Sequence, residues 1–219
     1  MSQELGKIEK PEASDYKSKR KIYLIPLIYS GDQKNKDYLS LFDTYWKQVR
    51  EQIENLESRV GKAKHIFHES ISDAGEEGLK VMAQLNIKTF EITRDKCKEN
   101  AVFEALEDKK IFEENIDWQR CLLIGLLSET VANKISDNFL ECSKRRYEYI
   151  GKKIDETLKE DEAAILFINE RNLVQFPADI EVFRVSPPAL NDIYRWVREQ
   201  SSAQSAEKKE NSKDKKQSG

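Results

Sequence analysis

The clearest pattern of apolar and polar positions lies between residues 37 and 60. Apolar side chains recur there at intervals of four and three residues, which is the spacing of one face of an α-helix. They are Phe42, Trp46, Val49, Ile53, Leu56 and Val60. Gly61 follows, and glycine commonly ends a helix. The pattern predicts an amphipathic helix, and its span of three heptads at most favours packing against a core over pairing with another chain as a coiled coil.

Short apolar runs bounded by polar residues predict β-strands. The expected strands are 21–29, 63–71, 87–93, 163–168 and 180–185, and further helices are expected at 72–86, 94–108, 108–127, 128–159 and 189–199. Helix 108–127 is more apolar than its neighbour, which predicts that it is more buried. The alternation of strand and helix predicts an α/β fold with a mostly parallel sheet of about five strands and a long helical insertion in the middle.

The two ends of the chain differ from its body. Residues 1–20 and 200–219 are polar and lack large apolar clusters, so we expect disordered tails there. The body, 21–199, is predicted to be a single α/β domain with a helical middle at about 94–160. Residues 1–21 and 201–219 each carry a net charge of +2, which leaves −7 on residues 22–200. An acidic body is a poor binder of duplex DNA.

Composition narrows the class of protein further. The chain has 219 residues, of which 38% are hydrophobic, and no apolar run is long enough to cross a membrane. The N-terminus lacks the apolar stretch of a secretory signal. The three cysteines, Cys97, Cys121 and Cys142, form no CxxC pair, which is typical of reduced intracellular thiols. We therefore expect a cytoplasmic protein with no membrane partner.

The familiar motifs for cofactors are absent from this sequence. It contains no GxGxxG, no GxxxxGK[ST] and no GxSxG, so no cofactor is predicted. His65 and His68 lie three residues apart on an expected strand, where side chains alternate between faces. The two histidines should therefore diverge, and no metal site is predicted.

Polar residues that follow the expected strands are candidates for a ligand site. The carboxyl ends of parallel strands meet at one edge of a sheet, where α/β proteins bind ligands. The candidates are Asp32, His68, Glu69, Glu170 and Arg171, and Thr93–Asp95 would join them if 87–93 is a strand. The alternative is that these are ordinary solvated loop residues.

The densest basic stretch is CSKRRYEYIGKK, in the long helix expected at 128–159. Arg145, Arg146, Lys152 and Lys153 fall opposite the apolar positions of that helix. They predict a charged solvent face, or alternatively a ridge that contacts RNA.

The stretch RRYEYIGKKIDETLKEDEAAILFI resembles part of the peptide-chain release factor and Pelota superfamily, over about residues 143–185. The Gly-Gly-Gln loop that carries peptide release in that family is absent, and SETVANKISDN stands before the helix instead. The resemblance implies a binding branch to which no catalytic residue carries over.

Three functional hypotheses follow. The leading one is a non-catalytic interaction or regulatory module with a protein partner. The second is a translation-associated factor that binds RNA or the ribosome through Arg145, Arg146, Lys152 and Lys153. The third is a small-ligand enzyme that uses the sheet edge around His68.

Overall fold

The computed structural model describes residues 16, 18–31 and 35–217, with side chains up to residue 202. A five-stranded sheet forms its centre, in the order β3-β2-β4-β1-β5, and all paired strands are parallel. The strands are β1 (Arg20–Pro26), β2 (Ala63–His68), β3 (Val102–Glu104), β4 (Ala163–Ile168) and β5 (Ile180–Arg184). The predicted α/β class and the parallel five-stranded sheet are confirmed.

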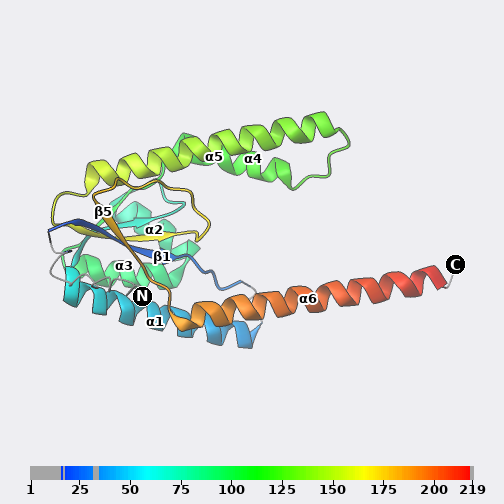
Figure 1. The fold of residues 1–219 in the computed structure, drawn as a ribbon, viewed down its shortest axis with the longest axis horizontal. Coiled ribbons are helices and arrows are strands. Elements are labelled where there is room, and N and C mark those ends of the chain that lie inside the picture. Colours follow the sequence, from blue (N-terminus) through cyan, green and yellow to red (C-terminus); the bar gives the residue numbers. More distant parts are fainter. Residues whose placement is uncertain (1–15, 17, 32–34, 218–219) are drawn as a thin grey trace, which may run out of the picture.

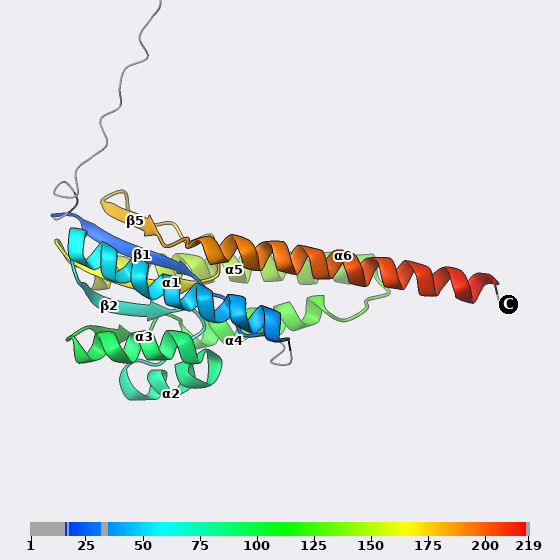
Figure 2. The ribbon, with the colours of Figure 1, turned by 90° about the horizontal axis from the view of Figure 1, so that it is seen from below.

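Helices cover both faces of the sheet (Figure 1). They are α1 (Lys36–Val60), α2 (Gly75–Leu85), α3 (Ile87–Lys98), α4 (Lys109–Leu122), α5 (Glu129–Thr157) and α6 (Pro188–Gln217). Helices α1, α2, α3 and α6 pack on one face in the larger core, and α5 packs on the other face in the smaller core. Figure 2 shows α1 beside the start of α6 on the first face.

The central strands explain why their sequences are apolar throughout. Along β1, Tyr23 and Ile25 face the larger core, whereas Ile22 and Leu24 face the smaller core. Because side chains alternate along a strand, a strand covered on both faces needs apolar residues at every position.

Helix α1 begins and ends close to the predicted positions. The Asn35 side chain accepts a hydrogen bond from the backbone N–H of Tyr38 and caps the first turn. Five of the six predicted apolar positions are buried, and Leu56 is partly buried against the same core. The prediction of core packing is confirmed.

The prediction of a third strand at residues 87–93 is wrong. These residues form the first half of α3, because the Asn86 side chain accepts hydrogen bonds from the backbone N–H groups of Lys88 and Thr89 and so starts a helix. The buried positions Thr89, Ile92, Thr93 and Lys96 recur at helical spacing. The third strand is instead β3, which lies within the helix predicted for 94–108.

The prediction that helix 108–127 is more buried than its neighbour is also wrong. In α4 only Asn115 is buried, and the chain beyond Leu122 forms a loop with exposed leucines. The first turns of α5 are likewise uncovered, since its buried residues begin at Cys142. The paired helices α4 and α5 extend past the edge of the sheet, where they pack against each other (Figure 1).

The predicted domain, 21–199, contains the sheet and its helices. The disorder predicted for residues 1–20 falls almost entirely outside the described residues. The chain continues as α6 through Gln217, and its side chains beyond residue 202 lie outside the description, so the disorder predicted for residues 200–219 stays a prediction.

Candidate functional site

The carboxyl edge of the sheet brings two of the predicted loops together. Strands β2 and β4 are neighbours, so the residues after them meet. The backbone N–H of Asn169 donates a hydrogen bond to the Glu69 carboxylate over 2.6 Å. Asp32 lies outside the described residues, and Thr93–Asp95 are in α3, so the prediction that they join this edge through a strand is wrong.

A buried ionic cluster forms at this edge. The Arg146 guanidinium of α5 donates to the Glu69 carboxylate over 3.1 Å and, through Nε, to the Glu107 carboxylate over 2.9 Å. Glu107 also accepts the backbone N–H of Ser70. All three charged side chains are nearly inaccessible to solvent. The cluster therefore ties α5 to the ends of β2 and β4.

The structure places Arg146 differently from the prediction that it faces solvent. Burial lowers the pKa of the Arg146 guanidinium, but the hydrogen bond and charge of Glu107 and the charge of Glu69 outweigh this effect. The pKa therefore stays above its ordinary value. Two carboxylates hold the guanidinium inside the protein. The prediction that Arg146 lies on the solvent face of the helix is therefore wrong.

The other three basic candidates lie on the outside of α5. Arg145 forms an ion pair with Glu114 of α4 over 2.7 Å. Lys152 lies 3.7 Å from Glu156 one turn away, and Lys153 is partly exposed. RNA contact by Arg145, Lys152 and Lys153 stays a prediction.

His68 is fully buried. Its Nδ1–H donates to the backbone carbonyl of Glu69, and its ring lies 5.9 Å from the Phe167 ring in the larger core. Burial lowers the pKa of His68 to about 4, against a smaller opposing effect of the Glu69 hydrogen bond. The ring is therefore a neutral part of the core rather than a group presented at the edge.

His65 has different surroundings. Its two ring nitrogens lie 3.0 Å from the Glu104 carboxylate and 3.2 Å from the Glu162 carboxylate. The two histidines share no partner. Within the described residues, no group of three or more His, Cys, Asp or Glu side chains is arranged to hold a metal ion.

Glu170 and Arg171 lie at the end of β4, beside α6. The Tyr194 hydroxyl donates to the Glu170 carboxylate, and burial together with this contact raises the pKa of Tyr194 well above its ordinary value. The Arg184 guanidinium of β5 lies 3.5 Å from Glu170. These two candidates therefore belong to a surface shared with α6, separate from the ionic cluster at Glu69.

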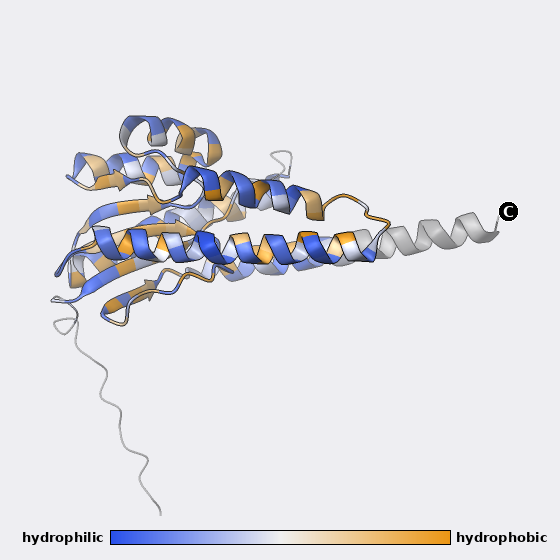
Figure 3. Cartoon of the chain, turned by 90° about the horizontal axis from the view of Figure 1, so that it is seen from above, coloured by the Kyte–Doolittle hydropathy of each residue, from blue (hydrophilic) through white to orange (hydrophobic). Residues whose placement is uncertain are grey.

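A second surface lies at the far end of the α4–α5 hairpin. Large apolar side chains are exposed in and beside the loop that joins the two helices, and Figure 3 shows this loop in the colour of hydrophobic residues. They are Leu122, Leu123, Ile124, Leu127 and Val131. Leu123 is 83% exposed and Leu127 is fully exposed, which is unusual for leucine. We call these five residues the hairpin tip.

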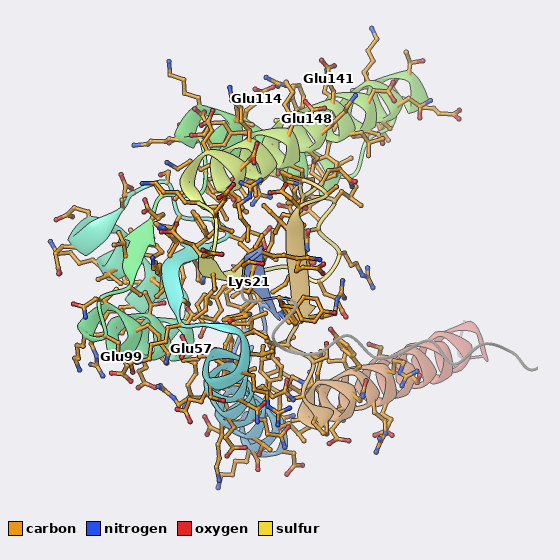
Figure 4. All side chains as sticks on the ribbon, turned by 60° about the vertical axis from the view of Figure 1, so that its left-hand side comes forward. Lys21, Glu57, Glu99, Glu114, Glu141 and Glu148 are labelled. Atoms are coloured by element: carbon orange, nitrogen blue, oxygen red, sulfur yellow. The ribbon has the colours of Figure 1, made fainter. Side chains whose placement is uncertain are left out.

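The residues on either side of the hairpin tip in the sequence include more acidic than basic side chains. Residues 113–141 contain six acidic and two basic side chains, a net charge of −4. Figure 4 shows Glu114 and Glu141 on the hairpin, with Glu148 further along α5. The outer hairpin is therefore an apolar tip with an excess of carboxylates, of which Glu114 is already paired with Arg145.

Two signals in the sequence would have found these features. Arg146 falls in the series Cys142, Arg146, Ile150 and Ile154, whose spacing of four marks one helix face, so a charge there indicates a buried ion pair. The run CLLIGLL contains a glycine and lies between two helices with polar flanks, which places leucines in a loop.

The chain matches no protein-family model, no curated protein and no solved structure. In the part of the chain that the structure describes, none of the helices combines the length and apolar character needed to cross a membrane.

Proposed function

We propose that this chain is a protein-interaction module that docks through the hairpin tip. The observation that carries the proposal is the cluster of exposed Leu and Ile side chains at the end of the hairpin. A cluster of large apolar side chains on the surface of a folded domain is typical of an interaction surface, because leaving such a cluster in water is unfavourable.

The arm that carries the tip is held firmly at its base. The buried ionic cluster of Arg146 joins α5 to the sheet, and Ile150 and Ile154 pack in the smaller core. Further out, Cys142 is buried against α4 and the Asn115 side chain donates to the Ser143 hydroxyl over 2.8 Å. A rigid arm lowers the entropy lost when the tip docks.

The charge of the arm selects the kind of partner. Nucleic acids and anionic lipid surfaces are disfavoured as partners, because residues 113–141 offer no excess of basic side chains to bind their phosphates. A protein with an apolar pocket bordered by lysine and arginine side chains complements both the leucines and the carboxylates. Burial of a leucine side chain contributes about 1.5–3 kcal/mol, so a few of them suffice as the energetic centre of an interface.

The test is site-specific photo-crosslinking in living cells. A photoreactive phenylalanine analogue replaces Leu123 in one variant and exposed Lys62, at the opposite end of the domain from the tip, in a matched control. We expect the probe at position 123 to give one discrete protein adduct that the probe at position 62 does not give. Mass spectrometry of the adduct should locate the cross-link in an apolar pocket with basic neighbours.

A second variant tests whether the apolar side chains are required. Ile124→Asp and Leu127→Asp together should abolish the adduct at position 123, while the free energy of unfolding changes by no more than about 0.5 kcal/mol per site because both side chains are exposed. Cross-links to nucleic acid, to lipid or to a second copy of this chain would each overturn the proposal, as would an adduct that survives both substitutions.

A further inference from the structure

A cleft of about 820 Å³ opens between the carboxyl edge of the sheet and the first turns of α6. Leu27 and Ile28 after β1, Glu170 and Arg171 after β4, and the 191–198 segment of α6 line it. Its size falls in the range of sites that hold small organic molecules. The hairpin tip contributes nothing to it, so the cleft is independent of the proposed function.

The cleft lies where the chain leaves two adjacent central strands in opposite directions. Strand β1 leads to α1 in the larger core, whereas the segment after β4 crosses to the other face, where Val174 and Phe176 pack in the smaller core. Loops that separate in this way leave a crevice at the carboxyl ends of the strands, and α/β proteins bind ligands in such crevices.

The charged side chains that line the cleft are mainly cationic. Arg171, Arg195 and Arg198 contribute guanidinium groups. The acidic group in the lining, Glu170, already accepts the Tyr194 hydroxyl and lies near Arg184. Among the described residues, Arg195 pairs with Asp192 over 3.3 Å, and neither Arg171 nor Arg198 has an ion-pair partner.

The apolar part of the lining indicates an organic ligand rather than a bare ion. Leu27, Ile28 and Val197 form an apolar patch beside the guanidinium groups. A guanidinium binds phosphate oxygens through two parallel hydrogen bonds, whereas the apolar patch would contact a carbon-rich portion of the same molecule. We infer that the cleft binds a phosphorylated small organic molecule, with its phosphate on Arg171 and Arg198.

Isothermal titration calorimetry on the full chain tests this inference. The probes are AMP, glucose 6-phosphate and phenyl phosphate, with adenosine as a neutral control and inorganic phosphate as a control for the anion alone. We expect at least one phosphate ester to bind with a submillimolar dissociation constant and to bind more weakly as salt is raised. Adenosine should not bind, and inorganic phosphate should bind more weakly than the ester.

Two arginine variants locate the binding site. Arg171→Ala with Arg198→Ala should weaken binding by about tenfold or more, because charge-assisted hydrogen bonds to the phosphate are lost. Arg59→Ala, at an exposed arginine at the end of α1, should leave the affinity unchanged.

Failure of all three esters to bind at millimolar concentration would overturn the inference, as would binding that the double variant leaves intact. Normal binding by the Ile124→Asp and Leu127→Asp variant would show that the cleft acts independently of the hairpin tip, and loss of binding in that variant would contradict the placement of the ligand in the cleft.

Discussion

His68 makes the stability of the fold depend on pH in a specific window. The side chain is fully buried, and burial lowers its pKa from an ordinary 6.5 to about 4, against a weaker effect of the Glu69 carbonyl. Between these two pH values the unfolded chain binds a proton that the folded chain does not bind. By linkage, this stability is complete above the unfolded pKa and decreases as the pH falls below that value, and the loss is complete once the pH has fallen through the folded pKa.

The two pKa values set the size of this effect. The difference between the two pKa values of His68 corresponds to ~3 kcal/mol of unfolding free energy, which is lost once the pH is low enough to protonate the ring in both states. Most of it falls within an accessible range, since going from pH 7 to pH 5 removes about 2 kcal/mol. That loss is a substantial part of the 5–15 kcal/mol that is typical for a folded domain.

Urea unfolding at pH 7 and pH 5, followed by tryptophan fluorescence, measures the effect. His68→Gln removes the titratable ring at similar volume, so the difference in unfolding free energy between the two pH values should shrink by about 2 kcal/mol relative to the unmodified chain. His65→Gln shows how much of the pH dependence the other histidine contributes. An unchanged pH difference in His68→Gln would refute the assignment of His68 as the neutral, buried group.

Two further substitutions test the ionic cluster and the close packing of α5. Arg146→Met leaves two buried carboxylates without their cation and should destabilise the fold by about 3 kcal/mol in urea at pH 7, whereas Arg145→Met on the outer face should change stability by less than about 1 kcal/mol. Gly151→Ala should cost about 1–3 kcal/mol because a Cβ there would lie 2.8 Å from the Gln175 carbonyl oxygen, whereas Gly125→Ala, with open space around it, should be nearly neutral. Equal effects within either pair would contradict the packing described for α5.

Local sequence patterns predicted the elements whose apolar faces are continuous. The helix at Lys36–Val60 follows from its regular spacing, and the strands at Arg20–Pro26 and Ala163–Ile168 follow from runs that are apolar at every position. The segment 87–93 was predicted wrongly because a short apolar run fits either a strand or a part of a buried helix. The cap supplied by Asn86 decided between the two.

The candidate sites were less predictable, because they depend on residues far apart in the chain. Glu69 and Glu170 were correctly placed at the ends of neighbouring parallel strands. The partners of Glu69 were not predictable in the same way, since Arg146 lies 77 residues away in sequence. The contribution of α6 to the cleft beside Glu170 also required the packed structure.

The sequence by itself determined the class of fold, the positions of the apolar helix and strands, and the acidic charge of the body. These properties are local, because the periods of helices and strands and the count of charges need no knowledge of partners. Only the tertiary structure decided that Arg146 is buried, that His68 is neutral in the core, and that Leu122, Leu123 and Leu127 are exposed. The physical reason is that burial is a property of contacts between elements, and the α4–α5 hairpin extends past the sheet that would have covered its apolar end.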